Sequence, residues 1–214
     1  MAITAREPDS GDFVRILAPD GMQAAICCDV VDRGEVVNEK FASVNHKVSL
    51  HFLLAETIPS KWQHPHTSDR VDVHEDMVGR PYGISRWFTL SLHEKAALRQ
   101  FLLTWRGKDF TAAELKGFDL EKLIGVPAAL NIIHKQSQDG TKWYANIAGV
   151  SKLPAAWDAP LIPADYQRIK DRDNGDTEAG PIEASDPEGV GYGPGYDFSG
   201  EPIPEDDGTD GLPF

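Results

Sequence analysis

The sequence predicts a mainly β domain with minor α structure, arranged as a five-stranded barrel with one principal helix and followed by a disordered acidic C-terminal tail. Several short apolar runs alternate with polar residues at the two-residue period of half-buried strands. Only the stretch 93–105 spaces its apolar residues as a helix does. The last part of the chain, 171–214, holds 13 acidic residues and one basic residue, with 9 glycines and 6 prolines. Such a segment buries too little apolar surface to offset the entropy lost on ordering.

The strand candidates follow one another with turn signals between them. A short strand is expected at 13–17, and an Ala-Pro-Asp-Gly turn separates it from an apolar run at 22–31. Residues 46–54 and 86–92 alternate between apolar and polar side chains. The intervening stretch 56–83, with three prolines and two glycines, is typical of a long loop.

Alternation also assigns the two faces of the strands at 46–54 and 86–92. The side chains expected in the core are Val48, Leu50, Phe52, Leu54, Phe88, Leu90 and Leu92. Those expected to point outward are Lys47, Ser49, His51, Trp87 and Thr89. Arg86 begins on the core face, but its position at the end of the strand lets its charge escape to solvent.

The rest of the domain completes a small barrel. Gly107 is expected to end the helix, and Asp119 to cap a short helix that ends at Gly125. Two strand-like runs, 128–135 and 141–150, are joined through an Asp-Gly turn as a hairpin. The chain has neither a Rossmann nor a Walker phosphate-binding loop. About five strands, one helix after the third or fourth and a closing hairpin favour the OB-fold, a five-stranded barrel, over a parallel α/β sheet.

Most of the formal net charge of -13 belongs to the tail. Residues 171–214 have a net charge of -12, which leaves -1 for residues 1–170. The acidic total therefore says little about the partners of the domain, and it does not exclude nucleic acid. A length of 214 residues suits one domain with a tail. The expected boundaries are a domain at 1–154, a linker at 155–170 and the tail at 171–214.

Composition points to a cytoplasmic protein. No apolar run approaches the length of a membrane-spanning helix, and the N-terminus lacks the pattern of a secretory signal. The two cysteines, Cys27 and Cys28, are adjacent, so they form neither a disulfide framework nor a metal knuckle. We expect no membrane partner, no cofactor and no enzymatic activity.

The end of the tail has the composition of a peptide ligand. An acidic run is followed by an apolar tripeptide that carries the C-terminal carboxylate. Phe214 can fill a pocket, while the carboxylates are attracted to a basic rim. This end resembles the acidic tails of bacterial single-stranded-DNA-binding proteins, which end in Pro-Phe and recruit replication and repair enzymes. The resemblance implies partner-binding roles for Asp206, Asp207, Asp210, Leu212, Pro213 and Phe214.

A second resemblance lies within the domain and covers roughly residues 80–154. It is carried by the segments 84–95, 98–99, 105–108, 117–120 and 144–147. These resemble a family of phage proteins whose members are OB-fold single-stranded-DNA-binding proteins or uncharacterised. The resemblance implies sequence-tolerant binding of single-stranded DNA in phage replication or recombination, with the acidic tip recruiting a replication or repair protein. The sequence also leaves a homo-oligomer possible.

Single-strand binding needs cations for phosphates and exposed aromatic rings for base stacking. Strand alternation and the polar loop at 56–83 supply such residues on several segments. The candidates are Lys47, His51, Lys61, Trp62, Arg80, Tyr82, Arg86, Trp87, Lys142 and Tyr144. On the last strand Trp143, Ala145 and Ile147 are expected inside, because they form its more apolar face.

Two other functions are compatible with the sequence. Histidines and carboxylates concentrated at 64–76 could hold a divalent metal in a nuclease, although no HExxH or CxxC motif accompanies them. Alternatively, the protein is an acidic adaptor or DNA mimic that binds no DNA. If the domain does bind DNA, the acidic tail is expected to compete for the same basic groove and to weaken binding at low salt.

Overall fold

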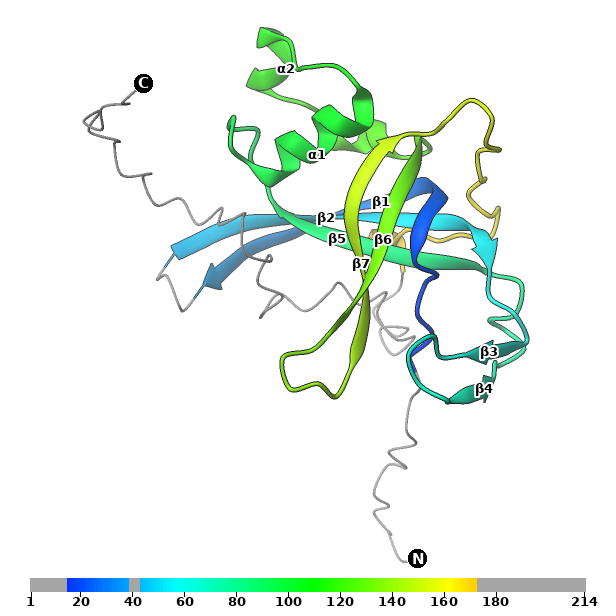
Figure 1. Ribbon diagram of the computed structural model, residues 1–214. Coiled ribbons are helices and arrows are strands. Elements are labelled where there is room, and N and C mark those ends of the chain that lie inside the picture. The colour runs from blue at the N-terminus through cyan, green and yellow to red at the C-terminus, as the bar shows by residue number, and fades with distance from the viewer. Residues whose placement is uncertain (1–14, 39–42, 173–214) are drawn as a thin grey trace, which may run out of the picture.

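The computed structural model describes residues 15–38 and 43–172 (Figure 1). Five antiparallel strands form one sheet in the order β5-β2-β1-β6-β7. Their bounds are β1 Gly21–Asn38, β2 Ser43–Thr57, β5 Pro81–Thr89, β6 Pro127–Gln136 and β7 Trp143–Lys152. Two short strands, β3 (Lys61–Gln63) and β4 (Arg70–Asp72), pair separately within the segment expected to be a loop. A mainly β architecture with few helices is therefore confirmed.

Strand β1 is long enough to pair with β6 at its beginning and with β2 along most of its length. Two irregularities interrupt its pairing with β2, between Cys27 and Asp29 and between Asp32 and Gly34. An extra residue bends a strand and increases its twist. Gly34 accommodates the second irregularity with a φ of 68°, a conformation that costs glycine little. The strand consequently continues beyond residue 31, where its apolar pattern ends.

The sheet does not close into a barrel, which corrects the sequence prediction. The edge strands β5 and β7 share no backbone ladder. Instead Arg86 of β5 donates from Nη1 to the carbonyl oxygen of Ile147 in β7 at 3.0 Å. Its guanidinium lies 5.2 Å from the ring centroid of Phe88 and 5.5 Å from that of Phe101. Arg86 thus bridges the gap between the edge strands, and its predicted escape to the outer surface is wrong.

Helix α1 (Ala97–Arg106) packs against both edge strands. It buries Leu98, Phe101, Leu102 and Trp105 and ends, as predicted, at Gly107 in the left-handed conformation. Helix α2 (Ala112–Lys116) was not expected from the apolar pattern, and the Thr111 side chain caps it. A 3-10 helix follows at Leu120–Leu123, capped by Asp119 as predicted. In Figure 1 the helices lie at one end of the sheet and β3 and β4 at the other.

The predicted core of β2 is confirmed, because Val48, Leu50, Phe52 and Leu54 are all buried. Phe88 is buried as well, whereas Leu90 is 43% exposed. The prediction for Leu90 is wrong because β5 ends at Thr89, so strand alternation no longer determines where the following side chains point.

The segment after β7, expected to be a linker at 155–170, returns to the sheet and packs against β1. Its side chains Ile162 and Tyr166 cover a small second core of Ile26, Cys28 and Leu53. Arg168 donates to the buried Asp29 at 2.9 Å and to Glu121 through two nitrogens at 2.7 and 2.9 Å. A last 3-10 helix, Ile169–Asp171, donates its first N–H to Asp29 at 2.7 Å. Most of the predicted tail, from residue 173 onward, lies outside the described residues.

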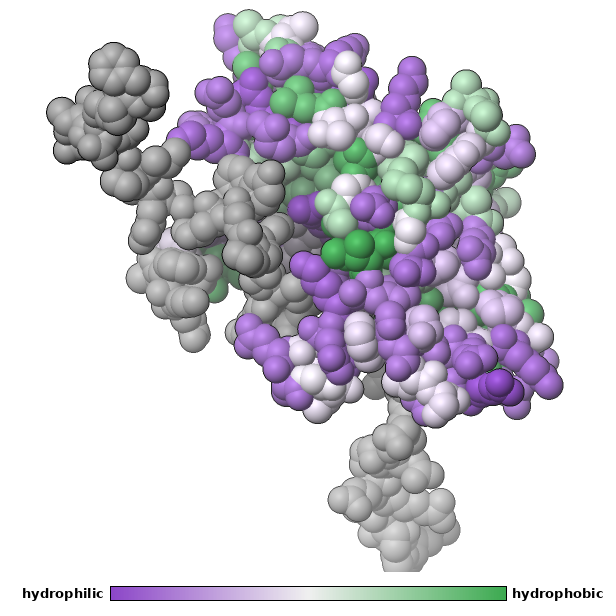
Figure 2. Space-filling view, in the orientation of Figure 1, coloured by the Kyte–Doolittle hydropathy of each residue, from purple (hydrophilic) through white to green (hydrophobic). Residues whose placement is uncertain are grey.

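The surface differs between the two ends of the molecule. On the face shown in Figure 2, hydrophilic side chains dominate over the β3–β4 and β6–β7 hairpins. Hydrophobic surface on this face gathers nearer the helices and the segment after β7. Within the described part of the chain, no helix combines the length and apolar character needed to cross a bilayer.

Candidate nucleic-acid interface

A cation and an aromatic ring meet on the outer face of β1, β2 and β5. The guanidinium carbon of Arg33 lies 4.9 Å from the ring centroid of Trp87, and both side chains are half-buried. Such a pair combines attraction between a cation and a π face with a planar surface that nucleotide bases can stack on. We call Arg33, Ser49, His51 and Trp87 the Arg33–Trp87 cluster.

Hydrogen bonds fix the orientation of Arg33 in this cluster. Its Nε donates to Ser49 Oγ at 2.9 Å, and Ser49 Oγ lies 2.9 Å from His51 Nε2. Since Oγ accepts from Arg33, its own hydrogen is available to His51 Nε2, which places the histidine proton on Nδ1. Nη2 of Arg33 lies 3.3 Å from the same Nε2. The guanidinium is therefore held over the indole before any ligand arrives.

At neutral pH, Arg33 is the only charged residue of the Arg33–Trp87 cluster. Burial, and then the neighbouring Arg33, lower the pKa of His51 to about 4, so this histidine is neutral at pH 7. Burial also lowers the pKa of Arg33, although a guanidinium stays charged at neutral pH. A single fixed positive charge on a partly desolvated surface is suited to bind one phosphate.

The neighbouring positions extend the polar surface of the same sheet face. Lys47 is half-buried and donates to Thr89 Oγ1 at 2.9 Å, which places a second cation beside Trp87 along β5. At the β1–β2 hairpin His46 Nε2 lies 2.6 Å from Asp32. The Gly34 N–H and then His46 lower the pKa of Asp32, so this carboxylate stays charged near the cluster.

A second cation–aromatic pair lies on β7. The guanidinium carbon of Arg15 lies 4.9 Å from the ring centroid of Tyr144, and the preceding Lys142 is exposed. The opposite face of the strand packs inward as predicted, with Ile147 buried and Trp143 and Ala145 against the core. The structure thus places Tyr144 with a cation, but on a different part of the sheet from Trp87.

Three predicted DNA contacts are buried, so their expected exposure is wrong. Trp62 is 6% exposed and Tyr82 is 5% exposed. Both belong to the main core, because the β3–β4 hairpin and the start of β5 fold the segment once expected to be a loop back onto the domain. His51 is fully buried by its neighbours on the outer face. Alternation predicted the side of the sheet on which His51 lies, but not the groups that cover it.

The exposed cations Lys61 and Arg80 lie apart from the Arg33–Trp87 cluster. Lys61 is the first residue of β3, and Arg80 directly precedes β5 at Pro81, whereas Trp87 and Thr89 are at the other end of β5. A strand of this length spans about 25 Å. The structure therefore does not gather all the predicted cations into one site.

The histidine-rich segment forms a ring stack within the described residues. His66 stacks on Trp143 with 3.8 Å between centroids, and its Nε2 lies 2.8 Å from His134 Nδ1. His134 Nε2 lies 2.8 Å from the carbonyl oxygen of Ala18 and must donate to it, so His66 donates to His134. The described residues contain no group of three or more His, Cys, Asp or Glu side chains arranged to hold a metal ion.

Replacing His66 by alanine is expected to lower the free energy of unfolding by about 1 kcal/mol, since it removes one stack and one hydrogen bond. Thermal or urea unfolding monitored by Trp fluorescence measures the change. His74→Ala is the matched control, because His74 is largely exposed and pairs only with nearby Asp76. Equal effects of the two substitutions would contradict a structural role for the His66 stack.

Sequence analysis missed Arg33 and Arg15. Asp32-Arg33-Gly34 has the composition of a turn, and the apolar run at 22–31 predicts no strand beyond residue 31. Strand β1 continues past this point with an irregularity, so its residues after 31 show no regular apolar alternation. Arg15 is the middle residue of the short strand expected at 13–17, but residues 15–20 are not a strand in the structure.

Comparison with family models, with curated proteins and with solved structures finds no match to this chain.

Proposed function

We propose that the domain binds single-stranded DNA with little sequence preference, in phage DNA replication or recombination. The observation that carries the proposal is the Arg33–Trp87 cluster, with Lys47 beside it, on the outer face of the sheet. A fixed cation serves a phosphate, and an aromatic face serves a base, whatever the base is. A mechanism of this kind needs neither a catalytic group nor a cofactor.

The order of the strands supports the same proposal. The sheet order β5-β2-β1-β6-β7, with α1 between the third and fourth strands of the main sheet, is the order of an OB-fold. That fold is a partly open barrel, and it binds oligonucleotides on the face of its second and third strands. In this chain those strands are β2 and β5, which carry Lys47 and Trp87. We therefore propose an OB-fold whose seam is bridged by Arg86.

The partner-docking role of the tail is a proposal from the sequence alone. Asp206, Asp207, Asp210, Leu212, Pro213 and Phe214 lie outside the described residues. Their composition, an acidic run before apolar residues, suits recognition by a basic, apolar-lined pocket on a replication or repair protein.

Fluorescence anisotropy tests the DNA proposal directly. Full-length protein is titrated against a labelled oligo-dT of about 30 nucleotides, long enough for one OB-fold site. We expect binding that weakens steeply between about 50 and 200 mM salt, because phosphate contacts release counterions. Unlabelled duplex should compete poorly. Absence of binding, both in the full chain and after removal of residues 173–214, would refute the proposal.

Removal of residues 173–214 is expected to raise the affinity for oligo-dT severalfold at low salt. This segment carries 12 acidic and no basic residues, so its field opposes the approach of DNA to the domain. The difference should shrink as salt rises, because screening acts on the tail and the phosphates alike. Unchanged or weaker binding by the shortened chain at low salt would argue against this competition.

A further inference from the structure

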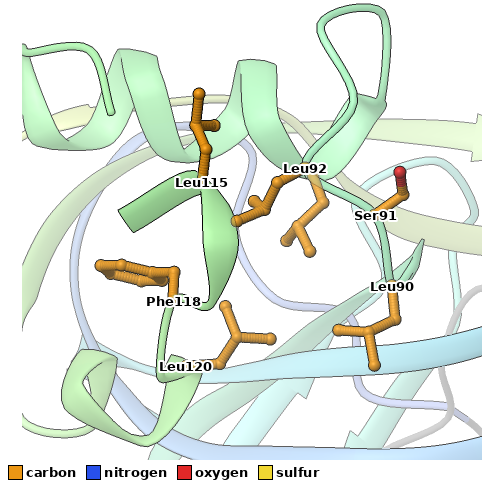
Figure 3. A pocket seen from close by; sticks show the side chains of 7 residues that line it. Leu90, Ser91, Leu92, Leu115, Phe118 and Leu120 are labelled. Atoms are coloured by element: carbon orange, nitrogen blue, oxygen red, sulfur yellow. The ribbon is translucent and has the colours of Figure 1, made fainter. Parts of the chain in front are cut away.

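An apolar hollow lies at the helical end of the domain, where β5 ends and α1 and α2 follow. It has a volume of about 190 Å³, and Figure 3 shows side chains from several segments turned toward it. Its apolar lining consists of Leu90, Leu92, Leu98, Leu115, Phe118 and Leu120. Ser91 is the one polar residue that lines it. Sites for small ligands usually measure at least about 300 Å³, so this hollow suits one or two side chains rather than a cofactor.

Two of these apolar side chains are exposed to solvent, unlike the leucines of the main core. Leu90 is 43% exposed and Leu115 is 39% exposed. They lie on opposite sides of the hollow, one just after β5 and the other in α2 (Figure 3). Exposed leucines on the two sides of a depression are typical of a surface that binds another apolar group.

Unpaired lysines lie on the segments that form the hollow. Among the described residues, Lys95, Lys108, Lys116 and Lys122 make no ion pair, whereas Arg99 pairs with Asp109 and Arg106 with Glu114. Glu121 is already engaged by Arg168. The segment 90–122 therefore retains four lysine charges against the two carboxylates of Glu94 and Asp119. The surroundings of the hollow attract an anionic ligand with an apolar end.

The C-terminus of this chain has that chemistry. Leu212, Pro213 and Phe214 supply apolar groups, and the carboxylates of Asp206, Asp207 and Asp210 precede them. The 42 residues after Arg172 extend to at most about 140 Å. A domain of this size has a radius of gyration of about 15 Å. The tether is therefore long enough to bring the chain's own end to the hollow.

We propose that the hollow between β5, α1 and α2 binds the C-terminal tip of the same chain, with Phe214 between Leu90 and Leu115 and the tip carboxylates near the lysines. A bound tip is withheld from other proteins, so the domain itself regulates whether the tip is available. The hollow begins where β5 ends at Thr89, the residue to which Lys47 donates, so it adjoins the proposed DNA-binding face. Binding of the tip does not require that the domain binds DNA.

Fluorine NMR on the full chain tests the proposal, with Phe214 replaced by 4-fluorophenylalanine. The reference is a free peptide of residues 205–214 with the same label. We expect the fluorine signal of the chain to differ from that of the peptide, and to move to the peptide position in Leu115→Glu. Leu161→Glu is the matched control, because Leu161 is 85% exposed and does not line the hollow. It should leave the signal unchanged.

Leu90→Glu provides an independent substitution on the other wall, and circular dichroism checks that each variant is folded. A signal identical to that of the free peptide would overturn the proposal. So would a shifted signal that neither Leu90→Glu nor Leu115→Glu moves, because the tip would then lie elsewhere. A signal that returns to the peptide position on dilution would assign the hollow to the tip of a second copy and overturn binding within one chain.

Discussion

Replacing Arg33 by alanine is expected to weaken the binding of oligo-dT by about tenfold to a hundredfold at low salt. The substitution removes one fixed phosphate contact and one planar surface, and a stacked base alone contributes about 1–3 kcal/mol. It should also make the salt dependence shallower by about one counterion. Anisotropy titrations at several salt concentrations measure both quantities on the same protein.

Two further substitutions separate the geometry of Arg33 from its charge. Arg33→Lys keeps the charge but loses the planar fork that Ser49 and His51 orient, so an intermediate affinity is expected. Arg106→Ala is the matched control, because Arg106 also lies over aromatic rings but at the helical end of the domain. An equal loss in Arg33→Ala and Arg106→Ala would place the DNA elsewhere.

Acidification is expected to destabilise the domain by about 3 kcal/mol between pH 6.5 and pH 4 through His51 alone. Burial first, and then Arg33, lower the pKa of His51 to about 4 in the folded protein, whereas an unfolded histidine has a pKa near 6.5. Below pH 6.5 the unfolded chain therefore binds a proton that the folded chain does not. The free energy of unfolding falls with pH until the folded His51 also titrates.

Urea unfolding at a series of pH values measures this loss. His51→Gln retains an acceptor for Ser49 but cannot titrate, so most of the slope between pH 6.5 and pH 5 should disappear. His93→Gln, at an exposed histidine, should keep the slope. Glu121 and Asp139, whose hydrogen bonds lower their pKa values to about 2, lose their contributions only at lower pH. The same slope in His51→Gln and in the unmodified protein would disprove the assignment.

The sequence predicted those parts of the fold that depend on the spacing of apolar residues along a segment and on the residues that begin or end a helix. The alternation at 46–54 identified the buried face of β2, and Gly107 identified the end of α1. The signal for α2 was also present, since Thr111 and Glu114 form a capping box, but so short a helix has no apolar period. The predicted closure into a barrel was wrong, because closure depends on the distance between two edge strands that lie far apart in sequence.

The candidate site was predicted less well, for a related reason. Alternation placed Lys47, His51 and Trp87 on one face of the sheet, and the structure agrees. It could not show that Arg33, two strands away from Trp87, reaches across and covers His51. Trp62 was expected outside because its neighbours are polar, yet pairing with β4 brings it into the core.

The anchoring of the chain after β7 determines how the domain responds to tension. A protein that pulls on the C-terminal tip applies its force to the described domain at Arg172. The force then meets Arg168, whose bonds to Asp29 and Glu121 tie this segment to the first strand of the sheet and to the 3-10 helix before β6. These charge-assisted bonds act together with the packing of Ile162 and Tyr166 on the small second core, so a short segment shares the load. Because this segment belongs to no strand of the sheet, we expect it to detach under load before the strands separate. Force on the tip would then leave the proposed DNA-binding face intact.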